Sequence, residues 1–336
     1  LFMNIYDVSK KAGVSIATVS RVLNGKANVS DKSKSRVLNA MKELDYTPNI
    51  FARGLGLNTM KTIGIMCSDS SDAYLANAVY YIEQELRKNG YDSLLCCTGR
   101  DIITKKKYLD LLLSKRVDGI ILVGSQFVFN EPGDDCSYIA EASKELPIIL
   151  VNGFINSPDI YSILCDDYAA VYEVTSSLIE NGRRNIVYLY TSTSYSGLNK
   201  LNGFKDAFNS HSINTSQEYM HLCSKNISDA LDYLNSMYYK GLTIDAVVSS
   251  DDILAVGAVK YAHGHNIAIP DNIEIVGYNN SVISNCTEPE LTSIDSQVEL
   301  LSMKAVDTLM KVLCGDSVSN KNTVSAKIIK RNTTKF

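Results

Sequence analysis

The most informative side chains occupy residues 15–24, which read Ser-Ile-Ala-Thr-Val-Ser-Arg-Val-Leu-Asn. Ser15 is a good helix N-cap, because its hydroxyl can accept a hydrogen bond from an unpaired backbone N–H one turn in. One face of the resulting helix carries apolar residues at helical spacing: Val19, Val22 and Leu23. The other face carries small or polar residues and one cation: Ile16, Ala17, Ser20 and Arg21. This second face predicts a helix that contacts base edges in the major groove of DNA.

A second short helix precedes this one and completes the motif. It opens at Asn4 and Asp7, and its apolar residues are Ile5, Val8 and Ala12. Gly13 joins the two helices, because glycine adopts the positive φ of a tight turn without strain. Two short helices joined through a glycine are typical of the helix-turn-helix, whose second helix enters the major groove. An ordinary helical hairpin inside a core is the alternative.

A third helix closes the head. We expect it to be capped by Ser30 and to bury the apolar residues Val37, Leu38, Met41 and Leu44. The residue before Pro48 is pushed out of the helical region, so the head is predicted to span residues 1–47. Residues 48–61 hold two glycines and are too short for a stable isolated helix, which predicts a hinge that folds only on binding.

The charge distribution separates this head from the rest of the chain. The 336 residues carry a formal net charge of −4, which by itself does not indicate a nucleic-acid partner. Residues 1–60, however, hold nine lysines and arginines and four acids, a net charge of +5 that leaves −9 for the remainder. A basic head on an acidic body is expected when only the head meets phosphates.

From residue 62 onward strand-like and helix-like segments alternate, which predicts two successive runs of βα units. We expect strands at residues 63–67, 93–97, 119–123, 148–152, 186–190, 219–222, 246–249 and 273–277, with a helix at 203–210 among those between them. The predicted fold class is α/β: a three-helix helix-turn-helix head and an effector-binding and dimerisation body (62–336) of two parallel-sheet lobes. Lobe 1 is expected at residues 62–160 and 292–322, and lobe 2 at residues 161–291 and 323–336.

Other functions find little support in the sequence. It contains no nucleophile elbow, phosphate-binding loop, H-E-x-x-H or spaced Cys/His cluster, so we expect no enzyme, no cofactor and no metal. His263 and His265 flank a glycine at an expected helix end, which favours a helix stop over a metal site. The eight cysteines include no C-x-x-C pair, and no apolar run or leader pattern indicates a membrane segment. We therefore expect a cytoplasmic protein with reduced thiols.

The chain resembles the LacI/GalR family of bacterial transcription regulators over essentially its whole length. In the head the likeness rests on Tyr6-Asp7-Val8, Ala12-Gly13-Val14-Ser15, the stretch from Ala17 to Gly25, and Tyr46-Thr47-Pro48-Asn49. In the body it rests on Arg116-Val117-Asp118-Gly119, Asp252-Ile253-Leu254-Ala255 and Val276-Gly277-Tyr278. The head is most similar to the catabolite-control type. The resemblance implies a body with the fold of periplasmic sugar-binding proteins, which leaves a solute-binding protein as one alternative class.

The same resemblance implies a set of DNA contacts. Bases would be contacted by Ile16, Ala17 and Arg21, with Leu55 of the hinge wedged into the minor groove. The DNA backbone would be contacted by hydroxyls, amides and helix N-termini: Tyr6, Ser15, Ser20, Asn24, Asn28, Ser30, Ser33 and Asn49. The alternative for Leu55 is that it only fills the linker.

An effector cleft between the lobes is also implied. Its candidate residues are Tyr74, Ser125, Asn152, Asp166, Lys200, Asp252 and Asn279. Here the chain departs from its family, since Lys200 stands where an arginine is common, Asn279 where an aspartate is, and Ser224 near a usual aromatic platform. Lysine cannot clamp a ligand at two points as arginine does, and Asn279 lacks the charge of a carboxylate. The expected effector is a sugar or sugar phosphate; a degenerate cleft controlled by a protein co-regulator is the alternative.

The implied macromolecular partner is a double-stranded, pseudo-palindromic operator bound by a homodimer, with one recognition helix in each half-site. A dimer is expected rather than a tetramer, because residues 330–334 are not followed by a heptad repeat. We expect a repressor whose operator affinity is coupled to closure of the lobes, and an activator is the alternative.

Overall fold

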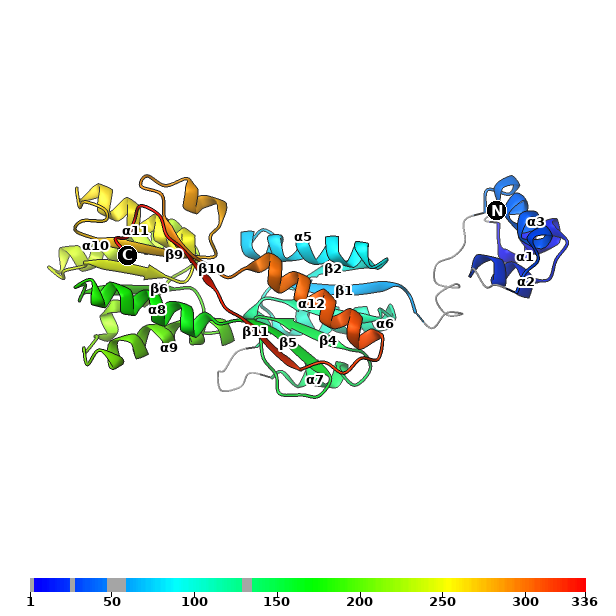
Figure 1. The fold of residues 1–336 in the computed structure, drawn as a ribbon, viewed down its shortest axis with the longest axis horizontal. Coiled ribbons are helices and arrows are strands. Elements are labelled where there is room, and N and C mark those ends of the chain that lie inside the picture. Colours follow the sequence, from blue (N-terminus) through cyan, green and yellow to red (C-terminus); the bar gives the residue numbers. More distant parts are fainter. Residues whose placement is uncertain (1–2, 25–27, 47–58, 129–134) are drawn as a thin grey trace.

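The computed structural model describes residues 3–24, 28–46, 59–128 and 135–336. The described residues of the head form three helices, α1 (Ile5–Ala12), α2 (Ile16–Leu23) and α3 (Asp31–Glu43) (Figure 1). Each begins at a side chain that accepts backbone N–H groups of its first turn: Asn4, Ser15 and Ser30. The helices meet in a small core of Val8, Ala12, Val19, Val37 and Ala40. The sequence therefore predicted the three helices and their caps correctly.

One of the four residues predicted to form the buried face of the third helix points to solvent instead. Leu38 is 49% exposed, whereas Val37 and Ala40 are buried. Residues one apart on a helix are separated by about 100°, so a stripe that begins at Val37 continues at Ala40, Met41 and Leu44 and leaves Leu38 outside. The prediction that Leu38 belongs to the head core was wrong.

The first lobe is built on a six-stranded sheet in which every pairing is parallel. Its order is β11 (Lys321–Val324), β5 (Ile160–Cys165), β4 (Ile148–Val151), β3 (Gly119–Val123), β1 (Thr62–Cys67) and β2 (Asp92–Cys97). One face packs against α5 (Ala73–Lys88) and α12 (Val298–Leu313). The other packs against α6 (Ile102–Ser114) and α7 (Ser137–Ala142). Burial on both faces explains the continuous apolar runs of these strands.

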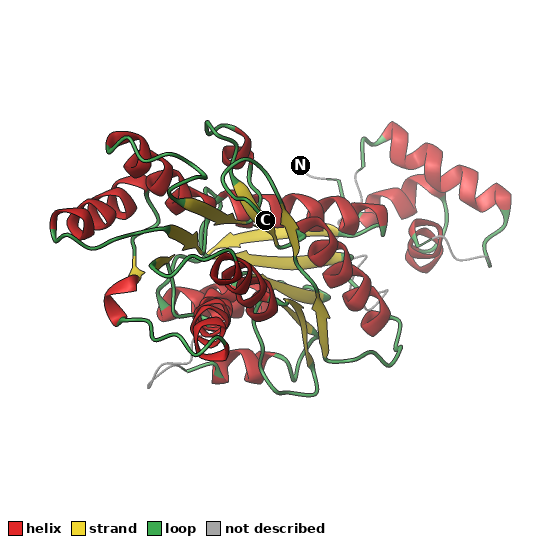
Figure 2. Cartoon of the chain, turned by 60° about the vertical axis from the view of Figure 1, so that its left-hand side comes forward, coloured by secondary structure: helices red, strands yellow, loops and turns green. Residues whose placement is uncertain are grey.

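The second lobe repeats this plan with one change. Its sheet has the order β12 (Lys327–Ile329), β10 (Thr292–Asp295), β9 (Glu274–Tyr278), β8 (Ala246–Ser249), β6 (Ile186–Tyr190) and β7 (Met220–Leu222). Helices α8 (Asp167–Glu180) and α9 (Tyr195–Ser210) cover one face, and α10 (Ile227–Tyr239) and α11 (Asp252–Gly264) cover the other (Figure 1). Figure 2 shows helices on the outer sides of the strands. β12 runs antiparallel to β10, so this sheet is not wholly parallel as expected.

The lobe boundaries differ from those expected. β5 lies in the first sheet, where it pairs with β4 and β11, so lobe 1 continues to Cys165 rather than ending at residue 160. β10 pairs with β9 in the second sheet, so residues 292–295 belong to lobe 2 and not to lobe 1. The chain crosses between lobes after β5, between β10 and α12, and between β11 and β12. These boundaries depend on pairing between strands that are far apart in the sequence, and local sequence patterns do not predict such pairing.

Helix α9 begins eight residues before the expected start at Gly203, at Tyr195. Its first turns contain Ser196, Gly197 and Asn199, which sequence propensity assigns to a loop. Packing requires small residues here: a Cβ on Gly197 would lie 2.1 Å from the carbonyl oxygen of Ser192, and one on Gly203 2.4 Å from that of Tyr168. Close approach of α8 and α9 therefore overrides the local preference.

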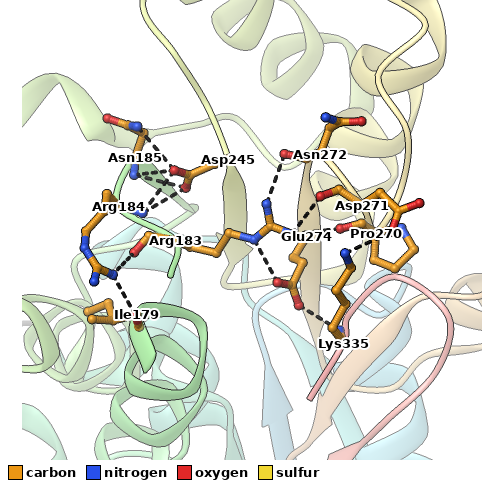
Figure 3. A network of polar contacts seen from close by, with 10 residues as sticks. All are labelled: Ile179, Arg183, Arg184, Asn185, Asp245, Pro270, Asp271, Asn272, Glu274 and Lys335. Carbon is orange, nitrogen blue, oxygen red and sulfur yellow. Dashed lines mark hydrogen bonds and ion pairs between the residues drawn. The ribbon is translucent and has the colours of Figure 1, made fainter. Parts of the chain in front are cut away.

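A polar network ties together segments of lobe 2 that are far apart in the sequence (Figure 3). Arg183 Nε donates to Glu274 Oε1 at 2.8 Å, and its Nη2 donates to the carbonyl oxygen of Pro270 at 2.8 Å. Glu274 is 1% exposed, and its second oxygen accepts the backbone N–H of Lys335 at 2.7 Å. The last residues of the chain are thus held beside the start of β9.

Candidate DNA-binding face and interlobe cleft

Helix α2, the predicted recognition helix, is positioned on the head by several local contacts. Gly13 ends α1 with φ 62°, and Arg36 Nη2 donates to its carbonyl oxygen at 3.3 Å. Ser15 Oγ then accepts the backbone N–H of Thr18 at 3.2 Å, and Val19 is fully buried beneath. The turn, the cap and the buried residue together fix the direction of α2.

The predicted base-contacting face of α2 is open to solvent. Ile16 is 39% exposed, and Ala17 and Arg21 are also exposed. Within the described part of the chain Arg21 makes no hydrogen bond or ion pair, so its guanidinium is free to approach a guanine. Leu55 lies outside the described residues.

The predicted backbone-contacting residues divide into two groups. Tyr6 is 67% exposed, and Asn28 is exposed as well. The others already make bonds within the head: Ser15 and Ser30 cap helices, Ser33 bonds to Ser30, and Asn24 donates to Ser20. Asn49 lies outside the described residues. Two of these sites are helix N-termini, where backbone N–H groups favour a phosphate.

The carboxyl ends of the two sheets enclose a cleft with two adjoining cavities, of about 110 Å³ and about 1040 Å³. Five of the seven predicted effector residues line the smaller one: Tyr74, Ser125, Asn152, Lys200 and Asn279. Asn152 Nδ2 donates to the Tyr74 hydroxyl at 2.7 Å, and the hydroxyls of Ser125 and Ser194 join the two lobes at 2.7 Å. Burial raises the pKa of Tyr74 well above its usual value, so its hydroxyl stays neutral.

The remaining two predicted residues do not line either cavity. Asp166 Oδ1 accepts the backbone N–H of Ala169 and caps α8. Asp252 is fully buried and accepts hydrogen bonds from the Ser281 N–H, the Ser281 hydroxyl and the Ser293 hydroxyl at 2.6, 2.7 and 2.6 Å. Burial raises the pKa of Asp252 to about 6. Its carboxyl fixes the loop after β9 and leaves no oxygen for an effector.

The neighbouring acids, Asp167 and Asp251, line the cleft instead. In each case the residue that lines the cavity is one position away from the predicted one, because adjacent side chains at a helix start point in different directions. Asp167 is 3% exposed and accepts hydrogen bonds from the Tyr278 hydroxyl and, at 2.5 Å, from the Ser196 hydroxyl. The sequence signal was the Asp-Asp pair itself, which could not tell which member faces inward.

The Lys200 ammonium already contacts other side chains of lobe 2. Its Nζ lies 3.9 Å from Asp167 Oδ1 and 3.5 Å from the centroid of the Tyr278 ring. The side chain is 11% exposed, so both contacts act in a partly desolvated setting, where an ammonium over an aromatic face is strongly held. Lys200 is therefore a buried, paired cation.

Lys225 is the residue that sequence reasoning missed. Its Nζ lies 2.6 Å from Asp72 Oδ2 of lobe 1 and 2.7 Å from Asp251 Oδ2 of lobe 2. Burial tends to lower the pKa of Lys225, but the two carboxylates outweigh it and the pKa is raised. The smaller cavity is thus lined by three carboxylates and two ammonium groups, a balance that does not favour the sugar phosphate we expected.

The structure also bears on the other sequence predictions. In the described part of the chain no group of His, Cys, Asp and Glu side chains could hold a metal, and His265 bonds to Asn235 at 2.9 Å. All eight cysteines are free thiols. Across the same residues no helix is long and apolar enough to cross a bilayer.

A helix-turn-helix head joined to two stacked α/β lobes with a cleft between them defines a class of ligand-responsive DNA-binding proteins. Two family models match the chain: bacterial regulatory proteins of the lacI family over residues 4–49, and the periplasmic binding proteins and sugar-binding domain of the LacI family over residues 60–334. The chain belongs to the LacI family of DNA-binding transcription regulators, as its motifs indicated.

Individual relatives extend over the whole chain. An HTH-type transcriptional regulator of Lachnoclostridium phytofermentans is 57% identical over 334 residues, which covers 99% of this chain and 100% of the relative. The HTH-type transcriptional repressor PurR of Mannheimia succiniciproducens is 30% identical over 308 residues, with 91% of each chain covered. The lac repressor dimer, solved bound to operator and the anti-inducer ONPF, aligns with a TM-score of 0.88 at 25% identity and 99% coverage of both chains.

Proposed function

We propose that this regulator is a cytoplasmic repressor that binds a pseudo-palindromic operator as a homodimer, and that a sugar or sugar derivative in the interlobe cleft controls its operator affinity. The observation that carries the DNA half is the exposed face of α2. Ile16, Ala17 and Arg21 are displayed on a helix whose turn, cap and core are all satisfied within the head. Such a helix needs no rearrangement before it enters a major groove.

Selection of bound sequences from a random DNA pool tests the operator prediction. The expected product is a pseudo-palindrome whose half-sites are about one helical turn apart. Recovery of a single half-site, or of no consensus at physiological salt, would contradict the proposal.

Exposed apolar side chains on lobe 1 support the homodimer. Leu94 and Leu95 on the edge strand β2 are 41% and 46% exposed, and Tyr80 on α5 and Ile103 on α6 are 56% and 74% exposed. Apolar residues gathered at a sheet edge are typical of a surface that another chain covers. Light scattering at micromolar concentration should give twice the chain mass of 37.0 kDa. Four times that mass would indicate a tetramer.

An effector can shift the lobes only through its different affinity for their two arrangements. The cleft supplies the polar groups for this, since Tyr74, Ser125 and Asn152 of lobe 1 face Lys200 and Asn279 of lobe 2. Thermal shift against sugars identifies ligands, because binding raises the melting temperature. The same ligands should then release operator DNA in a gel-shift assay; ligand-strengthened binding combined with promoter activation would favour the activator instead.

A degenerate cleft under a protein co-regulator is the second candidate. The smaller cavity, about 110 Å³, is below the ~300–1,000 Å³ of usual small-molecule sites. If no sugar or sugar derivative binds a folded, operator-binding preparation, this candidate replaces the sugar effector.

A further inference from the structure

One cluster of charges joins the two lobes across the cleft. Lys225 Nζ contacts Asp72 of lobe 1 and Asp251 of lobe 2 at 2.6 and 2.7 Å. Because a single ammonium contacts both, the two carboxylates lie close together in this arrangement of the lobes. Two carboxylates at such a separation repel each other unless a cation lies between them.

Neither carboxylate can turn away to relieve that repulsion. Asp72 Oδ1 caps α5 by accepting the N–H groups of Tyr74 and Leu75 at 3.0 and 3.1 Å. Asp251 Oδ1 caps α11 by accepting the N–H of Ile253 at 3.1 Å. In both residues the cap uses one oxygen and leaves Oδ2 for the ammonium. The pair is therefore a preformed site for a cation, with one half on each lobe.

An independent feature beside this site indicates a hydroxylated ligand. Ser296 is 2% exposed and lines the smaller cavity together with Asp72, Lys225 and Asp251. Among the residues that the structure describes, its hydroxyl has no hydrogen-bond partner. Buried hydroxyls in native proteins are normally paired. Asn279 Nδ2, which donates to Asp251 Oδ2 at 3.2 Å, adds a second neutral polar group.

We propose that Asp72 and Asp251 form an ammonium site shared by the two lobes, that Lys225 occupies it in the absence of effector, and that the effector is a hydroxylated amine whose ammonium replaces that of Lys225. The proposal rests on the proposed function of the cleft and narrows its ligand class from sugars in general to amine-bearing ones. Lys225 thereby supplies the cation that this arrangement of the two carboxylates needs.

Closure can be measured without DNA. Two dyes attached through unnatural amino acids at the exposed positions Lys107 of lobe 1 and Asn209 of lobe 2 report the interlobe distance by energy transfer in the full chain. Lys225→Ala should open the cleft and lower the transfer. Propylammonium, the fragment that this substitution removes, should restore it, whereas propanol should not. Lys327→Ala removes another lysine that lines the larger cavity and should leave the transfer unchanged.

A second substitution tests the stated cause. Asp72→Asn in the Lys225→Ala background removes one of the two repelling carboxylates, so the cleft of the double variant should close again. Propylammonium should then leave its energy transfer unchanged. The proposed cation site is contradicted if the cleft of Lys225→Ala stays closed or if the cleft of the double variant stays open. It is also contradicted if propanol restores the energy transfer as well as propylammonium does.

The ligand class is tested by calorimetry on matched sugars. Glucosamine or galactosamine should bind at least tenfold more tightly than glucose or galactose. Lys225→Met removes the competing ammonium of the protein, so this variant should bind the amino sugar a further tenfold more tightly. Equal affinities within each pair, or no binding of either amine to Lys225→Met, would overturn the amine class. Operator binding by the same preparations reports the proposed function separately, so the two failures are distinguishable.

Discussion

The head and the cleft both present side chains for recognition, but they hold them in opposite ways. In the head, Ile16, Ala17 and Arg21 extend from two turns of one helix and have their faces open to solvent. In the cleft, Asp72 and Lys225 come from segments 153 residues apart and are already paired with each other. The head is complete before its partner arrives, whereas a ligand of the cleft must compete with bonds that the protein makes to itself.

This contrast predicts that substitutions in the two regions differ in their effects on DNA binding and on stability. A substitution on the DNA face should alter binding and leave folding nearly intact. A substitution at the buried charges of the cleft, Asp167 and Lys200, should alter stability as well, because each is buried beside its counter-charge. The predictions below test that difference, from the largest expected effect to the smallest.

Asp167→Ala should have the largest effect. It leaves Lys200 buried without its carboxylate and deprives the Tyr278 hydroxyl of its acceptor. We expect a loss of about 3–5 kcal/mol in the free energy of unfolding of the body, measured by urea denaturation. Asp206→Ala, which removes an acceptor of the partly exposed Tyr168 hydroxyl, is the control and should cost under about 1 kcal/mol. Equal losses in the two variants would contradict the contrast.

The pH dependence of stability should come next. Asp252, whose pKa burial raises to about 6 from an ordinary 3.8, holds its proton more tightly in the folded state than in the unfolded chain. Its stabilising contribution is therefore complete below about pH 3.8 and is lost as the pH rises through about 6. Between pH 4 and 7 this amounts to about 2 kcal/mol.

Asp252→Asn cannot ionise and should remove that loss. Melting temperatures of the two proteins from pH 4 to 7 provide the measurement, and the difference between them should narrow or reverse as the pH rises. Parallel curves would show that Asp252 titrates normally.

Arg21→Ala should change binding without changing stability. We expect it to lose about 1–3 kcal/mol of preference for operator over random DNA, because a bidentate contact to guanine is removed. Lys32→Ala is the matched control: as a surface cation it should weaken all sequences alike and flatten the salt dependence. If the arginine variant weakens operator and random DNA equally, Arg21 does not contact bases.

Ser15→Ala should have the smallest effect. Loss of the cap bond to the Thr18 N–H should cost the head about 0.5–2 kcal/mol and lower operator affinity through fraying of α2. Ser35→Ala, on the exposed face of α3, should be neutral. Helicity of the head and operator affinity, followed together, distinguish this cap effect from a direct contact, which would reduce affinity alone.

The outcome of the sequence predictions follows the same division. The caps Asn4, Ser15 and Ser30 and the glycine turn were identified correctly, because each depends on residues three or four positions away. The alternation of strands and helices likewise indicated the α/β body. Residues 47–58, which include most of the predicted hinge at 48–61, lie outside the described part of the chain, so the wedge role of Leu55 stays a prediction.

The cleft was predicted less well for a physical reason. The cavity is lined by Asp167 and Asp251, whereas the sequence pointed to Asp166 and Asp252. One position at a helix start turns a side chain from the cap or core into the cavity. Lys225 was missed because its role depends on an ion pair with Asp72, which belongs to the other lobe. No local pattern connects those two residues.

The sequence by itself determined the head, the α/β class and the family, since all three are encoded in short-range spacing and in motifs. Only the tertiary structure decided which strand joins which sheet, which acids face the cleft, and that an ammonium of the protein itself bridges the lobes. Such features arise when segments distant along the chain are brought within hydrogen-bonding distance, and that depends on the packing of both sheets together.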